Sequence, residues 1–299
     1  MTKKIVECVP NFSEGRDKDV MEAIADAIRQ VDGVKLLDYS GDPDHNRSVY
    51  TFIGQPESVV NAAFNACRVA AQRIDMSQHR GEHPRMGAAD VVPLIPISGV
   101  SIEECIELAK KLGNLIGQEL SIPVYLYGYA ATKPNRVELS DIRKGQYEGF
   151  FSKIKKPEWI PDYGPYEVNV KSGVTAVGVR KPLIAFNVNL NTNNIKIAQE
   201  IAKSVRYISG GLRYVKALGI RLNRDGIVQV SMNLVDYEKT PIYRVLELIK
   251  VEAKRYGVSV IGTEIIGLVP IKAILDSLKY YMQLEDLDVD KILETRLYE

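Results

Sequence analysis

The stretch KIVECVPNFSEGRDKDVMEAIADAIRQ, residues 4–30, begins the pattern that decides the fold. Its first part, Lys4 to Val9, is a short apolar run typical of a strand. A polar turn follows, and from Asp17 to Gln30 the apolar residues recur at helical spacing along one face. The stretch therefore predicts a strand that leads through a loop into an amphipathic helix.

Along the whole chain, the order strand, helix, strand, strand, helix, strand is predicted twice, with an offset of about 180 residues. That order is the split βαβ or ferredoxin-like unit. The first copy has predicted strands at 4–9, 34–39, 48–53 and 91–97 and helices at 17–30 and 56–73, followed by a helix at 101–119 and a strand at 124–129. The second has predicted strands at 183–190, 215–221, 226–233 and 258–269 and helices at 195–206, 241–256 and 271–282.

The predicted fold class is α/β (α+β), with two similar ferredoxin-like βαββαβ subdomains. We place them at residues 1–180 and 181–299, with the boundary near Val177 to Lys181. Such a sheet carries helices on one face and has a second face to cover. We therefore expect the two sheets to face each other across a cleft, with the helices outside.

Composition excludes several classes of protein. Of 299 residues, 39 are Lys or Arg and 38 are Asp or Glu, so the chain lacks the basic excess typical of nucleic-acid binders. No apolar run reaches the 18 residues of a membrane span, and the N-terminus lacks a secretory signal pattern. Three scattered cysteines suggest neither a disulfide framework nor a CxxC metal site. We expect a cytoplasmic protein that binds neither nucleic acid nor membrane.

The densest polar segment is HRGEHPRMG, residues 79–87, which holds two of the three histidines of the chain. It permits two kinds of chemistry. His79 and His83 with Glu82 match the HxxEH pattern of zinc peptidases, which works only on a helix. Gly81 weakens such a helix and Pro84 biases the preceding residue away from helical angles. We therefore favour a loop and predict no metal.

Proton transfer is the second possibility. A histidine whose pKa lies near neutrality can accept and return a proton within one catalytic cycle, and Glu82 can orient its ring. Arginines can hold a carboxylated substrate, which assigns that role to Arg47 and Arg85. Two further polar turns contain Asn11 and Asn46, the predicted supporting residues.

Several segments of the chain together resemble the formiminotransferase family. They are, in order, residues 7–15 (ECVPNFSEG), 46–52 (NRSVYTF), 81–88 (GEHPRMGA) with Asp90-Val91, 123–128 (PVYLYG), 229–234 (QVSMNL) and 266–270 (IGLVP). The segment around His83 is the most specific of them. The resemblance extends through nearly the whole chain.

The resemblance implies transfer of a formimino group from N-formimidoyl-L-glutamate to N5 of tetrahydrofolate, in histidine degradation. It also implies two similar subdomains, a folate tunnel between their sheets, a homodimer and no metal. The family's catalytic histidine falls on His83. Since the chain ends at Glu299, the cyclodeaminase domain fused to vertebrate members is expected to be absent. The family's folate-binding segment falls on Gly164, Pro165, Tyr166, Glu167, Val168, Asn169, Val170, Lys171, Ser172 and Gly173.

Three alternatives stay open at this stage. The first is a folate-dependent formyltransferase acting on N-formyl-glutamate or 5-formyltetrahydrofolate, since that donor differs by one oxygen in place of a nitrogen. The second is a folate-binding protein without catalysis. The third, more remote, is a zinc hydrolase that uses the HxxEH residues.

Overall fold

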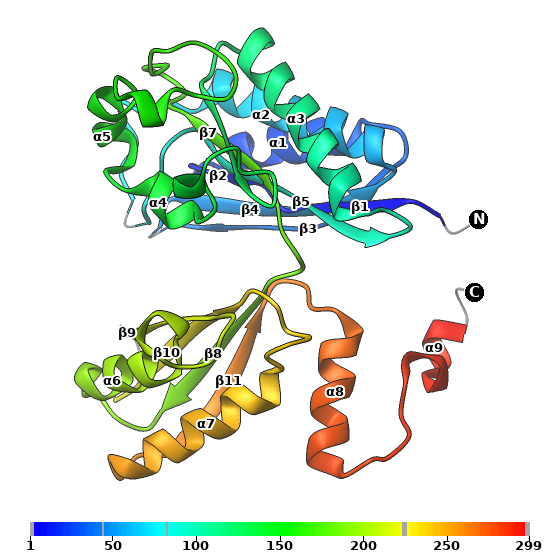
Figure 1. Cartoon of the computed structure of the whole chain (residues 1–299), viewed down its shortest axis with the longest axis vertical. Coiled ribbons are helices and arrows are strands. Elements are labelled where there is room, and N and C mark those ends of the chain that lie inside the picture. Colours follow the sequence, from blue (N-terminus) through cyan, green and yellow to red (C-terminus); the bar gives the residue numbers. More distant parts are fainter. Residues whose placement is uncertain (1–2, 44, 82, 223–225, 297–299) are drawn as a thin grey trace. The chain divides into compact units, whose positions relative to one another are not determined.

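The computed structural model describes residues 3–43, 45–81, 83–222 and 226–296. The chain divides into two compact units, Met1–Arg180 and Lys181–Glu299, which we call unit 1 and unit 2. Each contains one β-sheet with its own helices (Figure 1). The mixed α/β class with two sheets, as predicted, is confirmed. None of the helices in the described residues is long and apolar enough to cross a membrane.

Unit 1 contains a seven-stranded sheet. Strand β4 pairs with β3 on one side and with β1 and β2 on the other, all antiparallel. Strands β1 and β2 also pair with β5, and β7 and β6 then extend the sheet in parallel. The strands are β1 (Ile5–Cys8), β2 (Asn11–Phe12), β3 (Val34–Asp42), β4 (Arg47–Gly54), β5 (Ala89–Ser98), β6 (Val124–Gly128) and β7 (Thr175–Val179).

Three long helices cover one face of this sheet: α1 (Lys18–Arg29), α2 (Pro56–Arg73) and α3 (Ile102–Glu119). Their ends are fixed locally. The Asp17 carboxylate accepts hydrogen bonds from two backbone amides at the start of α1, and Ser101 forms a capping box with Glu104 at the start of α3. The starts of α1 and α3 therefore follow from capping residues, and the start of α2 follows from the proline in its first turn.

The opposite face of the sheet is not free of helices, which differs from the expectation of helices on one face. Alternate residues of β6 pack on opposite sides, with Val124 in the core under α3 and Tyr125 in a second cluster. That cluster includes Ile142 and Phe150, from the short helices α4 (Leu139–Arg143) and α5 (Gln146–Lys153). Strands β5 to β7 are therefore covered on both faces, as is typical of parallel strands.

Unit 2 contains a four-stranded antiparallel sheet in the order β11-β8-β10-β9. Its core lies on the face covered by helices α6 and α7, and Ala273 of helix α8 also belongs to that core. The two units share an order of strands. In unit 1, β1 lies between β4 and β5, and β3 lies beside β4; in unit 2, β8 lies between β10 and β11, and β9 lies beside β10. The elements are β8 (Ile184–Leu190), α6 (Ile195–Val205), β9 (Val215–Arg221), β10 (Val228–Leu234), α7 (Ile242–Arg255), β11 (Val260–Ile266), α8 (Ile271–Met282) and α9 (Leu293–Arg296).

Candidate functional site

The predicted polar turns meet at one edge of the sheet of unit 1. Phe12, at the end of β2, pairs with Ser48 on β4 and with Ala89 on β5. Asp42, the last residue of β3, pairs with Arg47, the first residue of β4. The loops after β2, between β3 and β4, and before β5 therefore lie together, although they are separated by more than 30 residues in the sequence.

Glycines allow these loops to approach each other closely. A Cβ atom on Gly15 would lie 2.4 Å from the carbonyl oxygen of Asp42, and one on Gly81 would lie 2.2 Å from that of His45. Asn46, with a positive φ of 47°, then connects the loops. Its side chain accepts a hydrogen bond from the Gly15 amide at 3.0 Å and donates one to the Arg80 carbonyl at 3.0 Å.

The centre of the site is Asp90, which is fully buried at the start of β5. One of its oxygens, Oδ2, accepts from Arg47 Nη1 at 2.7 Å and from Arg143 Nη2 at 2.5 Å, while Oδ1 accepts from the Met86 amide at 2.8 Å. Burial alone would raise the pKa of Asp90, but the two arginines outweigh it and lower the pKa to about 2. Asp90 is therefore ionised at neutral pH. We call Arg47, Asp90 and Arg143 the arginine–aspartate centre.

Asn11 orients one arm of this centre. Its side-chain oxygen accepts from Arg47 Nε at 3.1 Å and from Nη2 at 2.7 Å, and its amide donates to the Val9 carbonyl at 3.0 Å. The guanidinium of Arg47 is thus held between β2 and β5.

His83 lies beside the arginine–aspartate centre in a half-buried position. Its Nδ1 lies 2.7 Å from the Pro84 carbonyl oxygen. A carbonyl can only accept, so Nδ1 carries the proton of the neutral ring and Nε2 keeps its lone pair. Burial, followed by the charges of Arg47 and Arg143, lowers the pKa of His83 to about 4. This pKa lies below the value near neutrality that was expected, because burial and then the two nearby cations disfavour the protonated ring, and it leaves the imidazole neutral at pH 7.

His79 has a different environment. Its Nε2 lies 2.9 Å from the Asn46 carbonyl, and its Nδ1 accepts from Arg85 Nε at 3.2 Å. Both ring nitrogens are therefore occupied inside the protein, and burial, the largest cause, lowers the pKa of His79. These contacts hold the loops together, and they leave neither ring nitrogen of His79 available to accept a proton from a substrate.

Arg85 is also engaged in internal contacts. It forms a bidentate pair with Glu148 on α5, with Nη1–Oε2 and Nη2–Oε1 distances of 2.9 and 2.7 Å, and Nη1 also donates to Gln146 at 3.1 Å. Together with the bond to His79, these contacts use each nitrogen of the guanidinium. The predicted role of Arg85 in substrate binding stays a prediction, and its observed contacts join α5 to the loop of His83.

The segment 164–173 runs along the same unit. Gly164, with φ of 84°, lies against the backbone of Ile122, and a Cβ there would meet that carbonyl oxygen at 2.5 Å. Residues Pro165 to Glu167 are exposed, and Tyr166 is 70% exposed. At its other end the Ser172 carbonyl accepts from the Ala88 amide at 2.8 Å. The end of this segment is therefore bonded to the chain five residues beyond His83.

Sequence reasoning missed Arg143 and gave Asp90 no role, and Glu82, the predicted partner of His83, lies outside the described residues. Asp90 has a recognisable signal, because it is an acidic residue directly before a continuous apolar strand. Arg143 has none, since its contact depends on how α4 folds back across the sheet.

Over the part of the chain that the structure describes, no three His, Cys, Asp or Glu side chains are grouped as a metal site. The described residues of segment 79–83 also form no helix, so the geometry that an HxxEH site requires is not present there. This observation weighs against the zinc hydrolase alternative.

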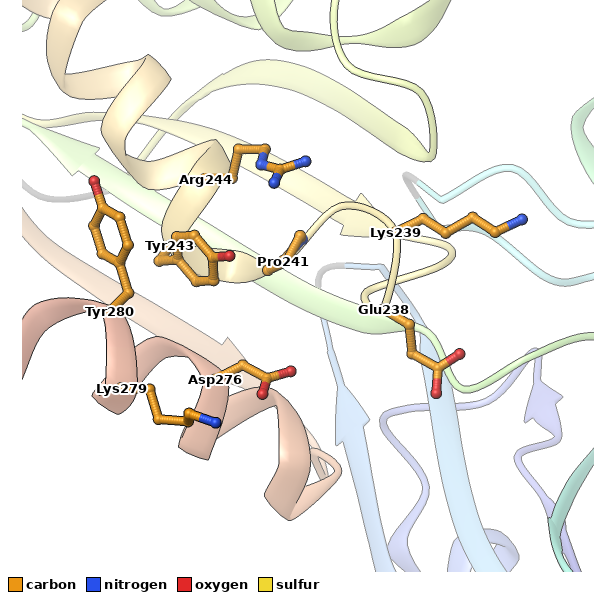
Figure 2. Close-up of a pocket in the computed structure, with 8 residues that line it drawn as sticks. All are labelled: Glu238, Lys239, Pro241, Tyr243, Arg244, Asp276, Lys279 and Tyr280. Carbon is orange, nitrogen blue, oxygen red and sulfur yellow. The ribbon is translucent and has the colours of Figure 1, made fainter. Parts of the chain in front are cut away.

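A separate hollow of about 450 Å³ lies in unit 2 between the start of α7 and helix α8 (Figure 2). It contains the stacked rings of Tyr243 and Tyr280, whose centroids are 4.4 Å apart. Its charged residues are of both signs, and none of the predicted site residues lies in it. Its lining residues are Glu238, Lys239, Pro241, Tyr243, Arg244, Asp276, Lys279 and Tyr280.

Comparison with known proteins gives matches along nearly the whole chain. The family model described as "Formiminotransferase domain, N-terminal subdomain" matches residues 5–180, and the one described as "Formiminotransferase domain" matches residues 185–296. Glutamate formimidoyltransferases of Streptococcus pyogenes serotype M1 and Thermoplasma acidophilum are each 51% identical to the chain over 295 residues. These alignments cover 98% of the chain and 99% and 97% of the two relatives. The formimidoyltransferase-cyclodeaminase of Mus musculus is 47% identical over 292 residues, covering 96% of the chain and 54% of that relative. On these matches, the chain belongs to the formiminotransferase family.

Proposed function

We propose that this chain is an enzyme that transfers the formimino group from N-formimidoyl-L-glutamate to N5 of tetrahydrofolate, in histidine degradation. The products are 5-formimidoyltetrahydrofolate and L-glutamate. Family membership and the names of the two relatives that align over nearly their full length support the reaction. The observation that carries the catalytic assignment is the neutral His83, whose Nε2 has no hydrogen-bond partner among the described residues.

The reaction requires one bond to form, one to break and one proton to move. N5 attacks the amidine carbon and becomes positively charged, after which it must lose a proton. The bond between that carbon and the glutamate nitrogen then breaks, and this nitrogen gains a proton. A single group that accepts at the first step and donates at the second balances the reaction without any redox change.

His83 is suited to this role because its proton already occupies Nδ1 and its Nε2 is the accepting atom. His79 offers no accepting nitrogen, since Asn46 and Arg85 occupy both. His45 binds the Asp42 carboxylate through Nδ1 at 2.7 Å in an exposed position. Of the three histidines, His83 is therefore the one that we assign as the general base.

We assign folate binding to the segment 164–173 and catalysis to residues 1–180, with residues 181–299 as the second subdomain. The exposed Tyr166 and Val170 offer apolar surface for an aromatic ring, and the far end of the segment is bonded to the loop that follows His83. By resemblance to the family we further propose that the enzyme is a cytoplasmic homodimer that takes tetrahydrofolate as its co-substrate and uses no metal.

A substrate assay tests the reaction. Purified chain is incubated with formimidoyl-glutamate or formyl-glutamate, each with and without tetrahydrofolate, and release of L-glutamate is measured. We expect folate-dependent release from formimidoyl-glutamate. Preference for formyl-glutamate would support the formyltransferase alternative, and release without folate would indicate a hydrolase.

Replacement of His83 tests the base. His83→Ala should lower kcat by roughly 10²–10⁴-fold, the usual contribution of general acid–base catalysis. Folate affinity should change little, because the base acts mainly in the transition state. His79→Ala is the matched control and should lower the free energy of unfolding by about 1–3 kcal/mol through its lost hydrogen bonds. If His79→Ala abolished turnover while His83→Ala retained it, the assignment would be wrong.

A further inference from the structure

The arginine–aspartate centre contains more positive than negative charge. Two guanidinium groups share one oxygen of the fully buried Asp90, at 2.7 and 2.5 Å. The side chains of Arg47 and Arg143 are only 9% and 17% exposed. With a neutral His83 beside them, the charges of the centre sum to one positive charge in a largely desolvated place. A buried charge for which the described residues supply no counter-charge is costly, so the centre is suited to receive an anion.

Arg143 also has an unused donor. Its Nη2 binds Asp90, whereas its Nε is buried and has no hydrogen-bond partner among the described residues. Buried donors without a partner are rare in native proteins and call for an explanation. A guanidinium presents its donors in a fork that matches a carboxylate, which makes a carboxylate ligand the natural partner.

The chemistry of the substrates decides which carboxylate fits beside His83. In formimidoyl-glutamate the departing nitrogen is attached to the same carbon as the α-carboxylate. A base that reaches this nitrogen must therefore lie close to the α-carboxylate. The γ-carboxylate is attached to Cγ, two carbon atoms further along the side chain. The glutamyl tail of folate is separated from N5 by the aminobenzoyl ring, so neither of its carboxylates can reach the reacting atoms.

We propose that Arg143, together with Arg47, binds the α-carboxylate of the amino-acid donor next to His83. This inference rests on the proposed transferase function and adds to it a residue on α4 and a choice between the two carboxylates of the donor. Arg143 would then touch the substrate, whereas Asp90 would position the two arginines.

The proposal also gives the site a way to change the basicity of His83. Among the described residues, the charged groups that act on its ring are Arg47 on β4, Asp90 on β5 and Arg143 on α4. The imidazole of His45, which binds Asp42, has its centroid 6.0 Å from that of His83. In the free protein the two arginines help to hold the pKa of His83 at about 4. A bound carboxylate neutralises part of their charge and so raises that pKa. Binding of the amino-acid substrate thus favours the protonated form of His83, which must later donate its proton to the leaving nitrogen.

Binding measurements with the full chain test the proposal without relying on turnover. N-formyl-L-glutamate is compared with N-formyl-4-aminobutyrate, which lacks only the α-carboxylate, by calorimetry and by NMR titration of labelled His83. The unaltered chain should bind the first ligand more tightly by roughly 30-fold or more, as expected for a desolvated charge pair. Binding of that ligand should raise the midpoint of the His83 titration by about one pH unit or more, since a nearby opposite charge acts on this scale.

Arg143→Met should bind the two ligands with nearly equal affinity, and Arg143→Lys should restore part of the difference. Arg68→Met, which removes an exposed arginine on α2, is the control and should bind as the unaltered chain does. The proposal is overturned if folded Arg143→Met or Arg143→Lys distinguishes the ligands as well as the unaltered chain, or if the unaltered chain does not distinguish them. The proposed function fails separately, if the unaltered chain binds both as described but transfers no formimino group to tetrahydrofolate.

Discussion

Units 1 and 2 have the same order of strands in the repeated pattern, yet they differ at its fourth strand. In unit 1 this strand is β5, which pairs with β1 and β2 on one side and with β7 on the other. In unit 2 it is β11, which over the described residues pairs with β8 alone and leaves Ile261 and Ile266 more than half exposed. The added strands β7 and β6 thus place β5 inside a wider sheet.

The polar centres of the two units differ accordingly. Asp90, on the enclosed β5, is fully buried and holds two arginines. On the sheet of unit 2 the buried amides of Gln229 and Asn189 bond to the partly buried carboxylate of Glu264. Gln229 Nε2 donates to Asn189 Oδ1 at 2.7 Å and to Glu264 Oε2 at 3.1 Å. The shared fold therefore does not specify the site. In unit 1 the additional elements enclose a carboxylate together with two arginines, whereas the buried carboxylate of unit 2, Asp236, pairs with a lysine, Lys181, that is 31% exposed.

The largest effect should come from breaking the charge balance of unit 1. Asp90→Asn leaves two largely buried arginines without their counter-ion and should lower the free energy of unfolding by about 3–5 kcal/mol. Denaturant unfolding of the full chain, with hydrogen exchange read separately at β5 and β10, measures the loss and locates it in unit 1. Asp276→Asn, which breaks an exposed pair with Lys272, should cost less than about 1 kcal/mol. Equal stability of Asp90→Asn and the unaltered chain would mean that the centre does not stabilise unit 1.

Acid should produce a somewhat smaller effect in the same unit. The pKa of Asp90 is about 2 in the folded chain, below the usual value near 3.9 of an unfolded chain. A depressed pKa contributes stability that is present above the unfolded value and is lost as pH falls through the folded value. Between about pH 4 and pH 2 the contribution of Asp90, on the order of 2–3 kcal/mol, should therefore disappear.

Unfolding measured across this pH range in the unaltered chain and in Asp90→Asn isolates that contribution. The variant lacks the carboxyl and should lose correspondingly less stability in acid. Parallel loss in both proteins would assign the acid sensitivity to other carboxylates.

Much of the fold could be predicted because its elements have local signals. Helices α2 and α8 begin and end where apolar periodicity and proline place them. Strand β7 was missed, because its five residues follow a polar segment and it is stabilised by parallel pairing with β5, more than 80 residues earlier. Helices α4 and α5 were missed for a related reason, since they are short and fold only against the second face of the sheet.

The candidate site could be predicted only in part. His83, Asn11, Asn46 and Arg47 stand in polar turns next to strands, and such turns at a common sheet edge can be recognised in the sequence. The distinction between His79 and His83 could not be predicted, because it depends on which ring nitrogens find partners after folding. The role of Arg143 could not be predicted, because its contact with Asp90 joins two residues that are 53 positions apart in the sequence.

The smallest effect should come from the amides of Gln229 and Asn189 in unit 2. Gln229→Met keeps the shape of the side chain but removes the donor to Asn189 and Glu264, so it should cost about 1–2 kcal/mol, as for lost buried hydrogen bonds without a lost ion pair. Hydrogen exchange at β8 and β10 should report the loss, while β5 stays unchanged. Asn233→Ala, an exposed site on the same strand, is the matched control and should change stability by less than about 0.5 kcal/mol. If Gln229→Met lowered the free energy of unfolding as much as Asp90→Asn does, the enclosed charges of unit 1 would stabilise the fold no more than the amide hydrogen bonds of unit 2.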